Sequence, residues 1–231
     1  MMLSFAVCGS PGRAQSISVL PVNVLLQPGQ SAATLTVANQ SNHETSIQIR
    51  AYAWNQPEGE DRLTTSDAVV VSPPIASIAA GSTQVVRLIL RQPPQDRETT
   101  YRILVDQIPP PAEPGIVHVV LRLSIPIFAE PTSRALPLVQ FRVEREGGQV
   151  YLVAANDGLR HEAVRDIVLS TSDGRKYTLD RGTLPYVLAG ATRRWHIATE
   201  DSLLKAGETL RLTAHADAGA IDEQVRVVAA P

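Results

Sequence analysis

The amino-acid sequence predicts an all-β protein built of two β-sandwich domains. Short runs that alternate apolar and polar residues recur along the whole chain, as expected for strands with one buried face. Clusters rich in Gly, Pro, Asn and Asp separate these runs, and no segment sustains the 3.6-residue period of a helix. The pattern stops at residues 128–137 and then restarts, which indicates a proline-flanked linker between two domains.

The first predicted domain spans residues 16–131 and contains seven strands. Seven short strands separated by turn clusters are typical of an immunoglobulin-like sandwich, although this chain lacks the cysteine pair that often joins the two sheets. Trp54 is a candidate for a core aromatic residue. The predicted strands cover residues 17–26, 32–39, 45–54, 67–73, 82–90, 100–108 and 115–131.

The second predicted domain spans residues 132–231 and is also all-β. Residues 139–146 and 150–157 form a predicted hairpin, and residues 166–179 form a second one that turns at Asp173-Gly174. Further strands are predicted from residue 192 to the C-terminus. A single closed barrel for the whole chain is the alternative architecture.

Composition excludes several classes of protein. The 231 residues are 44% hydrophobic and 19% charged, with a formal net charge of −2, which offers no general attraction to nucleic acid. No stretch approaches the roughly 20 apolar residues of a membrane helix, so no membrane insertion is expected. Residues 1–15 resemble a truncated signal peptide and contain the only cysteine, Cys8. A tail without structure is the alternative for this segment.

The sequence contains no recognisable catalytic or metal-binding motif. The five histidines lie far apart and none has the spacing of a metal-binding pair. Glu58, Glu60 and Asp61 cluster in a polar turn, which a solvated loop explains better than a general acid and base. We therefore expect neither an enzyme nor a bound cofactor.

Residues 115–131, GIVHVVLRLSIPIFAEP, form the most unusual predicted strand. Every odd position from Val117 to Ile127 is apolar, and half of the even positions are apolar too. Pro126 cannot donate to a β-ladder, so this strand should lie at the edge of a sheet. Soluble proteins normally shorten or cover a long apolar edge, because it pairs readily with other chains.

Three segments resemble the periplasmic chaperones of pilus and fimbria assembly, the PapD-like family. They are VVVSPPIASIAAGSTQVVRLIL (69–90), QDRETTYRILVDQIPP (95–110) and LSIPIFAEP (123–131). The resemblance implies two immunoglobulin-like domains set at an angle. It also implies that the edge strand is lent to an incomplete pilin subunit, a process called donor-strand complementation. The endings SIPIFAEP and YRILVDQIP look more like the archaic branch, which serves spore-coat-U-type subunits.

The resemblance also implies which residues would bind the subunit. Aligned on IPIFAEP, the side chains lent by the donor strand would be Val117, Val119, Leu121, Leu123 and Ile125. From the residues alone, a uniformly apolar odd face indicates by default a core face of the protein itself, with the mixed even face exposed to solvent; the resemblance favours the donor role.

The chain departs from the family at three positions. The best-known branch of the family anchors the subunit's C-terminal carboxylate with an Arg on the first strand and a Lys on the lending strand, and the resemblance aligns these positions with Asn23 and Pro126. Glu130 replaces an arginine of the domain interface. A carboxylate in a partly dry cleft still needs a donor. Arg102, Arg91 and Arg122 are therefore the candidates for the anchor.

The resemblance favours a periplasmic chaperone that delivers pilin subunits to an outer-membrane usher. Its partners would be pilin subunits and the usher, and the chain could self-associate when no subunit is bound. The alternative is a secreted structural or adhesive β-sandwich protein that associates with its own copies through the edge strand.

Overall fold

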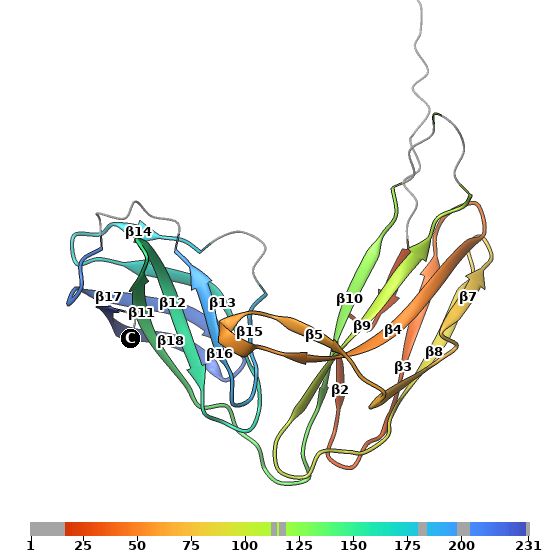
Figure 1. The fold of residues 1–231 in the computed structure, drawn as a ribbon, viewed down its shortest axis with the longest axis horizontal. Helices are drawn as coiled ribbons and strands as arrows, with labels where there is room; N and C mark the ends of the chain where they lie inside the picture. Colours follow the sequence, from red (N-terminus) through yellow and green to blue (C-terminus); the bar gives the residue numbers. More distant parts are fainter. Residues whose placement is uncertain (1–16, 112–114, 116–118, 180–183, 198–203, 230–231) are drawn as a thin grey trace, which may run out of the picture.

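The structure, a computed structural model, describes residues 17–111, 115, 119–179, 184–197 and 204–229. Strands dominate these residues and form two β-domains joined by residues 130–138 (Figure 1). The predicted all-β, two-domain fold is thus confirmed. The predicted signal peptide at residues 1–15 lies outside the described residues. No helix in the described ranges is long and apolar enough to cross a membrane.

The first domain is a sandwich of two sheets. One sheet has the order β1 (Ile17–Leu20), β3 (Ala32–Asn39), β8 (Thr83–Leu90) and β6 (Val69–Ser72). The other has the order β2 (Val24–Leu26), β10 (Arg122–Ala129), β9 (Thr99–Ile108), β4 (Thr45–Asn55) and β5 (Arg62–Thr65). A further strand, β7 (Ile75–Ile78), pairs with the start of β4. Alternate residues of both sheets point inward and form the core, including Leu35, Val37, Ile47 and Ile103.

The second domain encloses a separate core. Its pairing order is β14-β13-β17-β18-β11-β12-β16, and β15 pairs with β13. Trp195, Leu152 and Leu210 are fully buried at its centre. The predicted turn at Asp173-Gly174 connects β13 with β14. The strand bounds are β11 Val139–Glu146, β12 Gln149–Asn156, β13 Glu162–Ser170, β14 Lys176–Tyr177, β15 Tyr186–Val187, β16 Thr192–His196, β17 Thr209–Ala216 and β18 Gly219–Ala229.

Four details of the predicted strands are wrong. The strand predicted at residues 17–26 is two strands, β1 and β2, which lie in different sheets because the chain bends at residues 21–23. Strands β5 and β7 were not predicted, because all four residues of Arg62–Thr65 are exposed and Ile75–Ile78 is short, so neither shows an apolar period. The strand predicted at residues 115–131 begins only at Arg122. Its partner β9 ends at Ile108, so little ladder remains for the residues before Arg122, and backbone without a ladder partner is not a strand.

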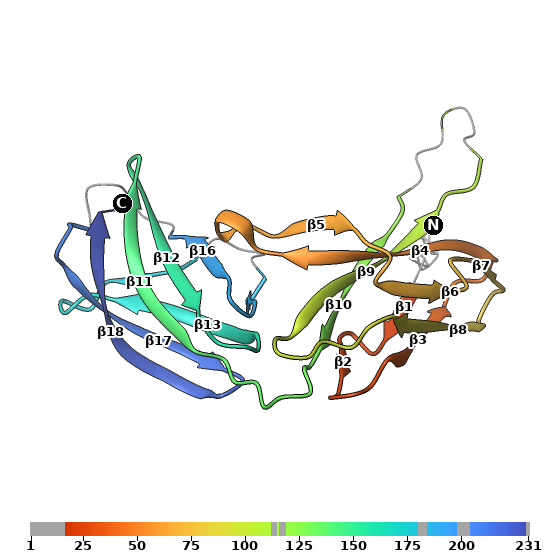
Figure 2. The same ribbon diagram turned by 60° about the horizontal axis from the view of Figure 1, so that its bottom comes forward.

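The hairpin formed by β4 and β5 extends out of the first domain and reaches the second (Figure 2). A short 3₁₀ turn, η1 (Pro57–Gly59), forms its tip and packs against β16. The two domains therefore contact each other through this hairpin as well as through the linker.

Candidate functional site

Strand β10 has one unpaired side over most of its length. All eight of its residues pair with β9, but on the other side only Ile127, Phe128 and Ala129 pair, in parallel, with β2. In the described chain, residues 122–126 therefore form an open sheet edge. Pro126 lies within it, as predicted for an edge strand. Just before the edge, the Leu121 carbonyl accepts a hydrogen bond from the Gln107 N–H of β9 at 2.9 Å.

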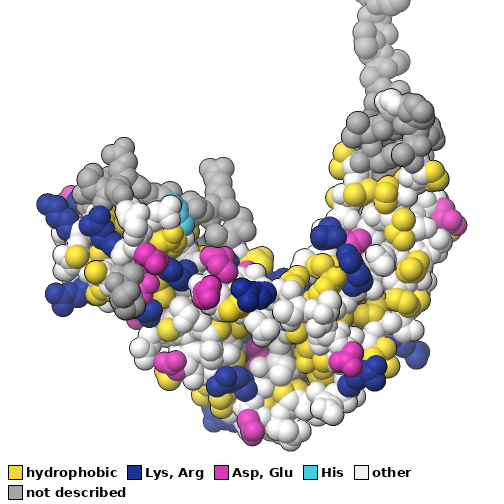
Figure 3. Space-filling view, viewed as in Figure 1, with side chains coloured by type: hydrophobic (Ala, Val, Ile, Leu, Met, Phe, Trp, Pro, Cys, Tyr) yellow, Lys and Arg dark blue, Asp and Glu magenta, His cyan; other side chains and the backbone are white. Residues whose placement is uncertain are grey.

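Apolar side chains are exposed at the upper end of this edge. Val119 is 79% exposed and Leu121 is 37% exposed, and Val120 and Ile108 are exposed beside them. Hydrophobic side chains also appear on this part of the first domain in Figure 3, below the grey residues. Exposed apolar groups on an unpaired strand favour addition of a foreign strand.

The five predicted donor residues lie in different environments. Val117 is outside the described residues. Val119 and Leu121 face solvent, whereas Leu123 is half-buried and packs against the core of the first domain. Ile125 is 4% exposed and belongs to that core. In the chain by itself, the side chains available to a partner are thus Val119 and Leu121.

An ionic cluster occupies the outer face of the sheet beside the open edge. Asp106 on β9 accepts a hydrogen bond from Arg50 Nη2 on β4 at 2.6 Å and another from Arg122 Nε on β10. Burial raises the pKa of Asp106, but the hydrogen bonds from Arg122 and Arg50 outweigh it, so the pKa lies below its ordinary value. A hollow of about 430 Å³ adjoins the cluster and is also lined by Ile108, Pro109 and Val120.

The structure places the three anchor candidates in separate environments. Arg91 follows β8 in the other sheet and donates from Nε to the Asp67 carbonyl at 2.7 Å. Arg122 and Arg102 lie on the same face of the open-edged sheet. They are four registers apart, about 13 Å at the usual strand rise. The structure therefore does not bring these arginines together.

Arg102 is buried where the two domains meet. Only 4% of it is exposed, and its guanidinium lies 3.7 Å above the ring of Trp54 and 5.8 Å from the ring of Tyr186. Its Nη2 atom is buried and has no hydrogen-bond partner in the part of the chain that the structure describes. Burial lowers the pKa of this guanidinium, and the nearby Asp61 carboxylate partly opposes that shift. Arg102 sits in β9 directly opposite Pro126.

An aromatic cluster joins the domains around Phe128, the penultimate residue of β10. The Phe128 ring lies against Trp54 and Tyr186 at centroid distances of 6.0 and 5.2 Å, and stacks on His161. Leu188 completes this cluster. The end of the open-edged strand is thus part of the domain interface.

Polar contacts surround the aromatic cluster. Gln56 donates to the Tyr186 carbonyl at 2.9 Å and accepts from the Leu188 N–H at 3.0 Å. The buried Glu98 carboxylate accepts from the His161 N–H at 3.1 Å and contacts the His161 ring Nδ1 at 2.8 Å. Glu130, which stands where the family has an arginine, pairs with Arg160 at 3.1 Å.

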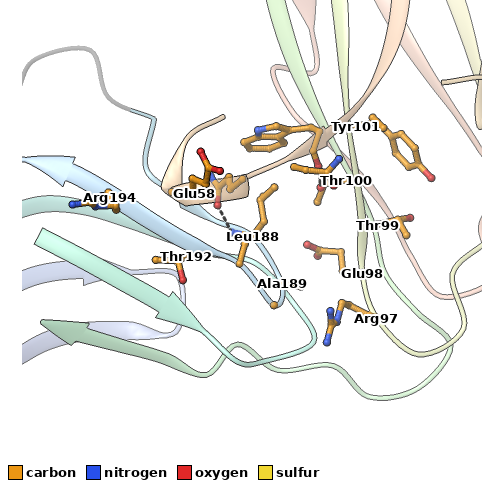
Figure 4. Close-up of a pocket in the computed structure, with 17 residues that line it drawn as sticks. Glu58, Arg97, Glu98, Thr99, Thr100, Tyr101, Leu188, Ala189, Thr192 and Arg194 are labelled. Atoms are coloured by element: carbon orange, nitrogen blue, oxygen red, sulfur yellow. Dashed lines mark hydrogen bonds between the residues drawn. The ribbon is translucent and has the colours of Figure 1, made fainter. Parts of the chain in front are cut away.

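A pocket of about 740 Å³ lies beside these contacts (Figure 4). Its walls come from the end of β4 with η1, the start of β9, and residues 188–194 of the second domain. Glu58 and Arg194 lie at one side, and Arg97 and Glu98 at the other. The described residues contain no cluster of three His, Asp or Glu side chains that could hold a metal ion.

Sequence reasoning did not find the domain interface. Trp54 was expected in a core, but its ring partners Phe128 and Tyr186 lie 74 and 132 residues away from it in the sequence. His161, which stacks on Phe128, lies 33 residues beyond that ring. No local period or motif connects such residues. The one available signal was Glu130, because a charge change at an interface position implies a changed partner.

The comparisons with known proteins identify the family. The sequence pattern described as "Pili and flagellar-assembly chaperone, PapD N-terminal domain" matches residues 16–135. The chain belongs to the PapD-like chaperone family. This family consists of assembly chaperones and is not a class of enzymes.

Curated PapD-like relatives agree with this assignment. The fimbrial chaperone YbgP of Escherichia coli K12 is 27% identical over 143 residues, 56% of this chain and 57% of that protein. The chaperone protein FaeE of Escherichia coli is 25% identical over 189 residues, 75% of this chain and 66% of that protein. The matched regions thus span about three fifths of these two relatives.

Solved structures of PapD-like chaperones have the same fold. One is a chain from the CsuC–CsuE chaperone–tip subunit pre-assembly complex of the archaic chaperone-usher Csu pili of Acinetobacter baumannii. Its TM-score is 0.67 at 20% identity, covering 94% of this chain and 100% of that one. Another comes from the Salmonella enterica SafA pilin in complex with the SafB chaperone. Its TM-score is 0.61 at 17% identity, covering 94% and 97% of the two chains.

Proposed function

We propose that this PapD-like chain is a periplasmic chaperone that binds incomplete pilin subunits by donor-strand complementation. The observation that carries the proposal is the open edge of β10, with Val119 and Leu121 exposed at its start. A subunit that lacks one strand would pair its backbone with this edge and cover the apolar side chains. The chain would then deliver the subunit to an outer-membrane usher.

The energy available at this edge suits a reversible complex. Burying a fully exposed Val or Leu side chain is worth roughly 1.5–3 kcal/mol. Because Val119 is 79% and Leu121 37% exposed, covering both offers about 2–3.5 kcal/mol before the costs of association. If the donor strand also lends Val117, this side chain would add the free energy of burying one more Val. Backbone hydrogen bonds along residues 122–126 would fix the register of the added strand. A competing strand of better fit could then replace the chaperone without nucleotide or metal.

For the subunit's terminal carboxylate, Arg102 is the anchor candidate that we favour over Arg91 and Arg122. Its Nη2 lacks a hydrogen-bond partner, whereas Arg91 and Arg122 already donate to Asp67 and Asp106. A buried donor gains most from a charged acceptor. Arg102 also lies opposite Pro126, which occupies the position of the family's anchoring lysine.

The fold likeness to an archaic Csu chaperone supports a place in the archaic branch, together with the sequence endings noted above. Spore-coat-U-type subunits are accordingly the proposed cargo. A periplasmic location follows from the family and from the proposed signal peptide at residues 1–15.

Co-expression with a spore-coat-U-type pilin subunit tests the proposal. The wild-type chain should keep the subunit soluble, and Leu121→Asp should lower the yield of co-purified subunit at least tenfold, because a buried carboxylate would lack a partner. Leu136→Asp is the matched control, since Leu136 lies in the linker and is 58% exposed. It should capture the subunit as well as wild type does.

Equal capture by Leu121→Asp and wild type would reject the donor-strand proposal. Sedimentation of the purified chain tests the alternative, self-association through the edge. If the wild-type chain forms dimers or polymers that Leu121→Asp does not form, and no subunit is captured, then the edge binds other copies of this chain instead of a subunit.

A further inference from the structure

The Arg50, Asp106 and Arg122 cluster carries more positive than negative charge. One carboxylate lies between two guanidinium groups, and Gln48 and Gln107, the other polar residues around the hollow, are uncharged. Arg50 Nε is also buried, with no hydrogen-bond partner among the described residues. Within the described part of the chain, the cluster thus has donors and a positive charge without a matching acceptor.

Asp106 and Arg122 lie in one row across the sheet, and Arg50 lies two residues further along β4, opposite Leu104. Gln48 on β4 is opposite Asp106 on β9, which is opposite Arg122 on β10. Arg122 is the last residue of the row, and its side chain is 61% exposed. On its far side the described chain offers no strand, so the row ends at the open edge.

A strand added to β10 would extend this row by one residue. Neighbouring strands lie about 4.8 Å apart, and residues directly opposite each other place their side chains on the same face. The side chain next to Arg122 on the added strand would therefore face its guanidinium. An acidic side chain there would provide a second carboxylate, so that Arg50 and Arg122 together face two negative charges. A basic side chain would instead be repelled by the unbalanced positive charge of the two arginines.

We infer that Arg122, held by Asp106 and supported by Arg50, selects an acidic side chain on the subunit strand that pairs with β10. This inference rests on the proposed donor-strand function and adds a rule for the partner. An Asp or Glu opposite Arg122 fixes the register, because a slip by one residue would move that side chain to the other face of the sheet. Arg122 on the even face of β10 would thus recognise charge, while Val119 and Leu121, just before the strand, bind apolar groups.

A charge-exchange experiment tests the inference with the same co-expressed spore-coat-U-type subunit. Arg122→Gln should weaken capture about tenfold, and Arg122→Glu should weaken it further through repulsion. Each Asp and Glu of the subunit is then changed in turn to Arg. One such change should restore capture by Arg122→Glu and weaken capture by wild type. Arg87→Glu, an exposed arginine on the other sheet, is the control and should change nothing.

A second variant checks the role of Asp106. Asp106→Asn releases both arginines, so capture should become more sensitive to NaCl than in wild type. Thermal unfolding of each variant shows whether it folds. If Arg122→Glu does not fold, the comparison of capture is made with Arg122→Gln.

The outcomes separate the inference from the function on which it rests. Normal capture by both Arg122 variants, with capture lost in Leu121→Asp, overturns the inference alone. A second result would also overturn the inference. If no acidic-to-Arg change in the subunit restores capture by the Arg122 variants, and deletion of the subunit's C-terminal residue also abolishes capture, then Arg122 binds the terminal carboxylate instead. Normal capture by Leu121→Asp overturns the function itself.

Discussion

The imidazole of His161 lies parallel to the phenyl ring of Phe128, with centroids 3.6 Å apart and planes 10° from parallel. Phe128 belongs to the first domain and His161 to the second. Because the buried Glu98 carboxylate holds His161 in place, the end of β10 is fixed against the second domain. The strand proposed to bind a subunit is therefore also a structural element of the domain interface.

Removing the Phe128 ring should uncouple the two domains. Truncation of a buried Phe to Ala typically costs 3–5 kcal/mol, and here the lost contacts connect the domains with each other. Calorimetry of Phe128→Ala should resolve two unfolding transitions, and small-angle scattering should show a wider range of interdomain distances. Leu212→Ala, in the core of the second domain alone, is the control. It should lower one transition without changing the scattering profile, and an unchanged profile for Phe128→Ala would contradict the prediction.

Neighbouring odd positions around β10 should differ sharply in their contribution to stability. Ile125→Ala should cost 2–5 kcal/mol because Ile125 is in the core, whereas Leu121→Ala should change stability by less than about 0.5 kcal/mol. Denaturant unfolding of the chain without a subunit measures both. Comparable losses at the two positions would mean that Leu121 is covered by the chain itself in solution.

Asp106 should make stability depend on pH in the acid range. Its pKa is lowered in the folded chain, so its contribution is complete above the ordinary pKa of Asp and is lost as the pH falls through the lower folded value. Asp106→Asn should therefore be less stable than wild type by about 1 kcal/mol at pH 7, with the difference shrinking below about pH 4. Urea unfolding at several pH values provides the comparison. A difference that stays constant down to pH 2 would show that the carboxylate charge is irrelevant.

Arg102→Ala should weaken subunit capture more than Arg91→Ala does. The buried Nη2 of Arg102 has no hydrogen-bond partner among the described residues and would gain one from the proposed carboxylate, whereas Arg91 is exposed and donates to a local carbonyl. Because Arg102 also stacks on Trp54, scattering should first establish that the variant keeps its interdomain arrangement. Capture should then fall about tenfold. Full capture by a correctly shaped Arg102→Ala protein would remove this residue from the anchor.

A side chain at Gly158 should clash with the linker, which lies against this glycine. A Cβ there would lie 2.5 Å from the Leu138 backbone nitrogen and 2.7 Å from the Pro137 carbonyl carbon, and backbone cannot move aside as a flexible side chain can. Gly158→Ala should thus destabilise the chain by about 1–3 kcal/mol. Gly174→Ala shows the effect of backbone strain without a clash, since nothing lies within 4 Å of its Cβ position but its φ of +88° disfavours Ala. Thermal unfolding of both variants against wild type provides the comparison, and a Gly158→Ala protein as stable as wild type would contradict the prediction.

The sequence was sufficient for the fold class because alternation reports which strand face is buried. Pro126 alone predicted the sheet edge, since the lack of an N–H is a local property. It could not show where β10 begins, because that depends on where β9 ends. The sequence also could not predict that Leu121 is exposed and Ile125 buried, because both residues are apolar and lie on the same face of the predicted strand.

The candidate binding residues were harder to predict than the fold. The three candidate arginines could be chosen by charge, but their environments depend on residues distant in sequence, such as Asp106 for Arg122 and Trp54 for Arg102. A side chain that stacks or pairs across strands leaves no periodic trace in the sequence.

The β4–β5 hairpin that enters the second domain limits how this protein can be recombined with its relatives. One cluster of side chains is shared by the two domains. It consists of Trp54 near the hairpin tip, Phe128 on β10, and Tyr186 and Leu188 of the second domain. A chimaera joined at the linker would inherit half of that cluster from each parent. Grafted domains will therefore keep their mutual orientation only when these aromatic and aliphatic residues are exchanged as a group.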